Sequence, residues 1–162
     1  MDTDTAHKKT SRVIAVIGAS GGIGSALAPR LRERGHRLLL GARRGERLDS
    51  MKQQLGPDAV ETASVDASDT ARVDEFFALG MEKFGRIDGV INLAGSILLK
   101  PAHLTSDKEF EETLRQNLWS AFAVVRCAGK AMRDTGGSVV LMSTAAARTG
   151  IPNHDAIAAA KG

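Results

Sequence analysis

The chain has no tyrosine, one cysteine (Cys127) and one tryptophan, and only 4% of its 162 residues are aromatic. A single cysteine excludes a fold held together by disulfides. So few aromatic side chains leave no platform on which bases could stack, and we predict no nucleic-acid partner. The 17 glycines follow no triplet period, which excludes a collagen-like chain.

Long apolar runs are also missing. The longest uncharged stretch, Val13–Pro29, is rich in glycine, serine and alanine and makes a poor membrane span. The segment Met1–Arg12 is polar and lacks the apolar stretch of a signal peptide. We therefore expect a cytoplasmic protein with no membrane partner, and we predict no metal site.

The remaining composition is typical of a globular domain, with 43% hydrophobic residues, 25% charged residues and a net charge of +3. Short apolar runs alternate with longer amphipathic ones, which predicts an α/β fold with a parallel sheet. The predicted strands are Val13–Ile17, Arg37–Leu40, Ala59–Val65, Gly89–Leu93 and Ser138–Met142. The predicted helices are Ile23–Arg34, Gly45–Leu55, Thr70–Phe84, Asp107–Arg133 and one that begins at Ala156.

A glycine-rich segment, residues 18–24, stands between the first predicted strand and the first predicted helix. Glycines there permit a tight turn and a close approach of the backbone to a pyrophosphate, and the helix N-terminus offers free N–H groups. This context predicts a dinucleotide site in a Rossmann-type doubly wound sheet. We assign residues 12–162 to one dinucleotide-binding domain and residues 1–11 to a flexible N-terminal tail.

The spacing of Gly18, Gly22 and Gly24 resembles that of the short-chain dehydrogenase/reductase family. Further matches follow in order along the chain. They are Asp66 after the third strand, Asn92-Leu93-Ala94-Gly95 after the fourth (with Leu93 in place of the family's second Asn), Asn117 in the long helix, Ser143-Thr144 after the fifth strand, and Ala158-Ala159-Ala160-Lys161.

This resemblance implies that a hydride moves between a nicotinamide cofactor and a small carbonyl or alcohol substrate. It also implies the cofactor-binding residues: Gly18, Ser20, Gly22, Ile23, Gly24, Arg43, Asp66, Asn92, Ala94, Gly95 and Lys161. Asp66 would meet the adenine, but it can also be read as a helix N-cap within residues 66–70. Asn92 can also be read as a residue that ties the strand end to a neighbouring loop.

The cofactor preference depends on the end of the second strand. Enzymes that use NAD place an acid there for the ribose 2′-hydroxyl, whereas this chain has Ala42 followed by Arg43. A guanidinium suits a 2′-phosphate, so we predict NADP(H). The alternative is that Arg43 and Arg44 only form a solvated turn.

The catalytic pattern is broken at one position. The resemblance implies catalytic roles for Asn117, Thr144 and Lys161, but the family's tyrosine position holds Ile157, which carries no ionisable proton. His154 could replace the tyrosine as proton donor, or it could be a loop residue beside an N-cap at Asn153 or Asp155. Cys127 is interpreted as a packing residue of the long helix.

Two functional hypotheses therefore stay open: an NADP(H)-dependent oxidoreductase with an altered active site, and a non-catalytic module that binds or senses NADP(H). The family's C-terminal elements are missing, so we expect part of a longer protein and an exposed apolar edge along Ser138–Met142. The stripe Leu114, Leu118 and Phe122 is compatible with a homo-oligomer or with ordinary core packing.

Overall fold

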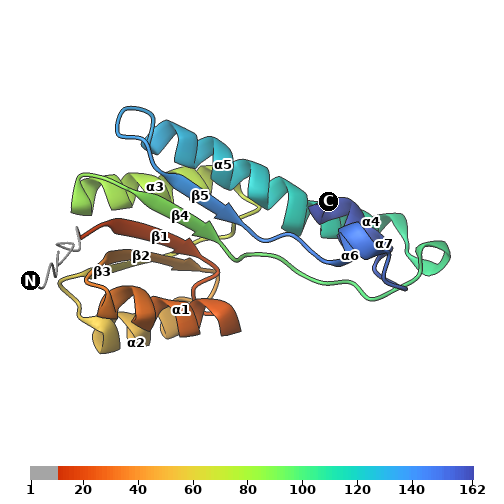
Figure 1. Ribbon diagram of the computed structural model, residues 1–162, viewed down its shortest axis with the longest axis horizontal. Helices are drawn as coiled ribbons and strands as arrows, with labels where there is room; N and C mark the ends of the chain where they lie inside the picture. The colour runs from red at the N-terminus through yellow and green to blue at the C-terminus, as the bar shows by residue number, and fades with distance from the viewer. Residues whose placement is uncertain (1–10) are drawn as a thin grey trace, which may run out of the picture.

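The computed structural model describes residues 11–162, in which five parallel strands form one sheet with helices on both faces (Figure 1). The strand order is β3-β2-β1-β4-β5. The order reverses beside β1, because β2 and β3 extend the sheet on one side and β4 and β5 on the other. The predicted doubly wound α/β fold is confirmed. The strands are β1 (Val13–Ile17), β2 (Arg37–Ala42), β3 (Val60–Ser64), β4 (Gly89–Asn92) and β5 (Ser138–Leu141).

Alternate side chains of β1 enter two separate cores, because successive residues of a strand point to opposite faces. Val13 and Ile17 pack with α3 and α5, and Val16 packs with α1 and α2. This two-sided burial explains why the strand is a continuous apolar run. The covering helices are α1 (Gly22–Glu33), α2 (Gly45–Leu55), α3 (Thr70–Phe84) and α5 (Ser120–Ala131).

The long helix predicted over residues 107–133 is interrupted, so that prediction is wrong in its middle. It consists of α4 (Asp107–Leu114), the π-helical turn η2 (Arg115–Trp119) and α5. The buried side chains of Asn117 and Ser120 bond to carbonyl oxygens of this region, Thr113 O at 2.9 Å and Gln116 O at 2.7 Å respectively. Such competing side-chain bonds are invisible to a search for apolar periodicity.

The apolar stripe of the long helix does not face the core. Leu118, Phe122 and Val125 are 53%, 52% and 43% exposed, whereas Ala123 and Val124 are buried. The core-packing interpretation of Leu118 and Phe122 is therefore wrong, because the sheet-facing positions are held by smaller side chains.

Three short helices complete the fold, one before α4 and two after β5, and the first two of them were not predicted. They are η1 (Ala102–Leu104), α6 (Ala146–Thr149) and α7 (Asp155–Lys161), and α6 and α7 lie beside α4 beyond the strand ends (Figure 1). Strand β5 lies at the edge of the sheet with Val139, Val140 and Leu141 exposed, as expected from its sequence.

The start of α7 differs from the expectation. His154 occupies the N-cap position, and no side chain caps the helix, so neither Asn153 nor Asp155 is the N-cap. The Asp155 carboxylate accepts a hydrogen bond from Ala102 N instead (3.1 Å). The predicted tail, residues 1–11, lies outside the described residues except for Ser11, whose hydroxyl donates to Gly35 O (2.8 Å).

Gly24 sets the distance between α1 and the end of β1. A Cβ at Gly24 would lie 2.6 Å from the Cα and carbonyl oxygen of Ala19, whereas a Cβ at Gly22 would meet nothing within 4 Å. We expect Gly24→Ala to lower the free energy of unfolding by about 1–3 kcal/mol through overpacking. Gly22→Ala should instead change it by less than about 1 kcal/mol. Urea unfolding of both variants checks this; equal effects would contradict it.

Candidate functional site

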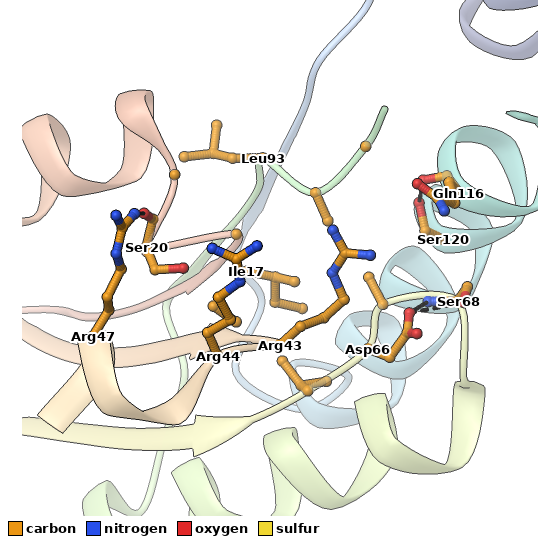
Figure 2. Close-up of a pocket in the computed structure, with 17 residues that line it drawn as sticks. Ile17, Ser20, Arg43, Arg44, Arg47, Asp66, Ser68, Leu93, Gln116 and Ser120 are labelled. Atoms are coloured by element: carbon orange, nitrogen blue, oxygen red, sulfur yellow. Dashed lines mark hydrogen bonds between the residues drawn. The ribbon is translucent and has the colours of Figure 1, made fainter. Parts of the chain in front are cut away.

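A pocket of about 290 Å³ opens at the carboxyl ends of β1–β4, where the strand order reverses (Figure 2). This crevice is where open α/β sheets bind their ligands. Six residues predicted from the sequence line it: Gly18, Ser20, Arg43, Asp66, Ala94 and Gly95. The other lining residues are Ile17, Gly21, Ala42, Arg44, Arg47, Val65, Ala67, Ser68, Leu93, Gln116 and Ser120.

The glycine-rich turn forms the floor of the pocket. Gly18 has a φ of +83°, and a Cβ there would lie 2.8 Å from Ala94 N. Its N–H donates to Gly41 O (2.8 Å) at the end of β2. The loops after β1 and β4 therefore meet, which brings the predicted residues Gly18 and Ala94 together.

Gly22, Ile23 and Gly24 form the first turn of α1 beside the pocket rather than its lining. No side chain caps this helix at Gly21, and its first turn holds no acidic residue. Its N–H groups therefore remain free for an anionic ligand, in the manner predicted for the pyrophosphate.

Three arginines line the same pocket. Arg43 and Arg44 follow β2, and Arg47 belongs to the first turn of α2. Figure 2 shows the guanidinium groups of Arg43 and Arg44 directed into the pocket and that of Arg47 beside Ser20, whose carbonyl oxygen is 3.4 Å from Arg47 Nη1. Within residues 11–162, none of the three pairs with a carboxylate. The sequence did not predict Arg47, because no local motif places the first turn of α2 beside the glycine-rich turn.

Asp66 lies at the opposite wall, in the loop after β3. Its Oδ1 accepts hydrogen bonds from Ser68 N (2.9 Å) and Ser68 Oγ (2.8 Å). These bonds, and the nearby charges of Arg115 and Arg43, hold the pKa of Asp66 below its ordinary value, so the carboxylate is ionised at neutral pH. The N-cap interpretation of Asp66 is wrong, because Asp69 caps α3 by accepting from Ala71 N (3.0 Å) and Arg72 N (3.3 Å).

The two predicted asparagines are buried and act on the loop after β4. Asn92 Oδ1 accepts from Ala94 N (3.1 Å), which agrees with the interpretation that it ties the strand end to a loop. Asn117 Oδ1 accepts from Ser96 N and its Nδ2 donates to Ser96 Oγ, both at 3.1 Å. The π-helical turn thus fixes the segment that contains Gly95.

Gly95, Asn117 and Lys161 come together although 66 residues separate the first from the last. A Cβ at Gly95 would lie 2.7 Å from Asn117 Oδ1 and 3.2 Å from Lys161 Nζ. Partial burial lowers the pKa of Lys161 below its ordinary value, because desolvation disfavours the ammonium. Because of these two short distances, only glycine fits at position 95 without displacing the side chains of Asn117 and Lys161.

Thr144 and Ile157 occupy the remaining positions of the predicted catalytic set. The half-buried Thr144 Oγ1 accepts from Ala146 N (3.3 Å), and Ile157 is buried, with 3% of its side chain exposed. The neighbouring Ser143 is exposed and donates to Lys161 O (3.1 Å). His154 Nδ1 lies 2.8 Å from Pro152 O in the turn before α7. The structure therefore places an apolar side chain, and no acid or base, at position 157.

Cys127 lies in the core with α3 and the sheet. Burial raises the pKa of its thiol, which keeps it protonated and agrees with a packing role. Among residues 11–162, no cluster of three or more His, Cys, Asp or Glu side chains has the geometry to bind a metal. In the same range, no helix is long and apolar enough to cross a bilayer.

The fold defines a Rossmann-type α/β protein with a pocket where its strand order reverses, and comparison with known proteins gives the family. A family profile described as short chain dehydrogenase matches residues 12–162. The chain belongs to this family. It is similar to D-threitol dehydrogenase of Mycolicibacterium smegmatis, with 32% identity over 99% of this chain and 63% of that protein.

One further relative is similar in sequence, and one solved structure is similar in fold. Levodione reductase of Leifsonia aquatica is 35% identical over 94% of this chain and 59% of its own length. The solved structure of an alcohol dehydrogenase from Thermococcus sibiricus, complexed with 5-hydroxy-NADP, superposes with a TM-score of 0.86 at 30% identity, covering 93% of this chain and 66% of that one. The chain thus spans about 60% of the length of the curated relatives it matches.

Proposed function

We propose that the protein is an NADP(H)-dependent oxidoreductase that acts on a small carbonyl or alcohol substrate, with an altered active site. The observation that carries this proposal is the pocket at the strand reversal, where arginines that pair with no carboxylate of residues 11–162 lie beside a glycine-rich turn. Two relatives support the reaction class, since one is named a dehydrogenase and the other a reductase. A similar solved structure contains an NADP derivative, which supports the cofactor.

The residues of the pocket fit a dinucleotide with a 2′-phosphate. The free N–H groups of α1 would hold the pyrophosphate, and Arg43 would hold the 2′-phosphate. Asp66 would contact the adenine side, and Lys161 would reach the nicotinamide ribose beside Gly95. When bound, the nicotinamide supplies or accepts the hydride.

The chain's own part in the chemistry is incomplete. The Thr144 hydroxyl would donate a hydrogen bond to the substrate oxygen, and Asn117 would hold the loop on which the cofactor lies. Ile157 supplies no proton, and loss of a positioned general acid typically costs about 10²–10⁴ in rate. We therefore expect slow turnover.

The second candidate function is a module that binds NADP(H) without catalysis. The burial of Ile157 favours it, because an apolar side chain fills the place of the proton donor. The retention of Asn117 and Lys161 beside Gly95 favours the enzyme. The two functions share the cofactor site and differ only in turnover.

The cofactor preference is tested by Arg43→Gln. One charge-assisted hydrogen bond contributes about 1.5–3 kcal/mol, so NADPH affinity should fall roughly ten- to a hundredfold while NADH affinity changes little. Titrations followed by nicotinamide fluorescence measure both. Arg30→Gln, on the exposed surface of α1, is the control for loss of one positive charge. Equal binding of NADH and NADPH by the native protein would contradict the proposal.

The altered active site is tested by Ile157→Tyr. Restoring a phenol one helical turn before Lys161 should raise carbonyl reductase activity by about 10²–10⁴. Ile157→Phe is the control, because it adds the same ring without the hydroxyl. If the native protein is active and His154→Ala abolishes that activity, the proton donor is His154. No gain in a folded Ile157→Tyr variant favours the non-catalytic module.

We also propose that two copies associate through the exposed apolar side chains of η2 and α5: Leu118, Trp119, Phe122 and Val125. Such a contiguous apolar patch is typical of an interaction surface. Light scattering should show a dimer or higher oligomer for the native protein and a monomer for Phe122→Glu. Leu104→Glu, at an equally exposed leucine outside the patch, should leave the mass unchanged. A monomeric native protein would contradict this proposal.

A further inference from the structure

Asp66 lines the same pocket as Arg43, and Glu112 stands in α4, three residues before Arg115. The positive charge of Arg43 lowers the pKa of both Asp66, in the loop after β3, and Glu112, in α4. An ionised carboxylate in this position has two unfavourable effects on a bound phosphate. It repels the phosphate, and it attracts the guanidinium that should bind it.

A second arginine engages both carboxylates from the π-helical turn. Arg115 donates through Nε to Glu112 Oε2 (3.0 Å) and through Nη2 to Glu112 Oε1 (3.1 Å). Its remaining Nη1 donates to Ser68 Oγ (2.7 Å), and Ser68 Oγ in turn donates to Asp66 Oδ1 (2.8 Å). One guanidinium thus holds Glu112 directly and Asp66 through a hydroxyl.

The pKa values reflect this arrangement. Hydrogen bonds from Arg115 and then Gln116 are the largest contributions that bring the pKa of Glu112 to about 2. For Asp66, whose pKa is lowered first by Ser68, the charge of Arg115 contributes more than that of Arg43. Arg43 itself pairs with no carboxylate in the part of the chain described here. The pairing therefore falls to Arg115, and the guanidinium of Arg43 is left for a ligand.

We propose that Arg115 is a specificity-determining residue of the pocket: by holding Glu112 and the Ser68–Asp66 pair, it leaves Arg43 free to bind the 2′-phosphate of NADP(H). This inference rests on the proposed cofactor. Figure 2 shows the geometry, with Asp66 and Ser68 at one wall of the pocket and Arg43 directed into the space beside them. Neither Arg115 nor Glu112 lines the pocket, so Arg115 acts through Ser68 and Asp66, which do, and through the charge of Glu112, which Arg43 also feels.

The test compares NADPH and NADH binding to the native protein and to Arg115→Gln by nicotinamide fluorescence. Because the Arg115–Glu112 pair is half exposed, we expect a moderate effect. NADPH should bind about 3- to 10-fold more weakly, while NADH stays within about twofold. The double variant Arg115→Gln/Glu112→Gln removes the competing carboxylate and should recover most of the preference for NADPH.

The control is Arg72→Gln, which breaks an exposed Arg–Glu pair of the same i,i+3 spacing in α3. It should leave both affinities unchanged. An Arg115→Gln variant that binds both dinucleotides more weakly by the same factor, without recovery in the double variant, would show that Arg115 only supports the Ser68 loop and would overturn the inference. An unchanged preference in Arg115→Gln would also overturn it. A native protein that does not prefer NADPH would overturn the proposed cofactor itself.

Discussion

The contact between the glycine turn and the loop after β4 is the constraint on which the site depends. The Gly18 N–H is bonded to the Gly41 carbonyl, and the Gly18 Cα lies so close to the backbone at Ala94 that no side chain fits between them. This contact draws the ends of β1, β2 and β4 to one point. The arginines after β2 and the acid after β3 therefore line one pocket together with the loop after β4.

The sequence predicts those parts of the molecule that depend on local pattern. The strands around Val13–Ile17 and the turn at residues 18–24 follow from β-branched runs and glycine spacing, and both are found. The resemblance to a family also placed Asn117 and Lys161, which meet across Gly95. These features are local, or belong to an ordered set of motifs, so one sequence is enough to predict them.

Features that depend on tertiary contacts were missed. The π-helical turn at Arg115–Trp119 interrupts a helix whose apolar pattern continues through the turn. The turn was missed because the pattern of apolar residues does not reveal the buried side-chain hydrogen bonds that accompany it, such as that of Asn117. Asp66 and Asp69 are both plausible caps in sequence, and only the geometry shows that Asp69 caps α3. Arg47 reaches the pocket, and Arg115 reaches Ser68 at its wall, through tertiary contacts that no local motif predicts.

The π-helical turn also determines what the loss of a residue would do in this part of the chain. A π-helical turn closes its hydrogen bonds over one residue more than an α-helical turn, so η2 holds one residue that a continuous α-helix would not need. Losing that residue should leave an uninterrupted α-helix, with Ala123 and Val124 still on the buried side of α5. The loss would fall on the turn itself, where Asn117 holds the loop after β4 and Ser120 bonds back to Gln116.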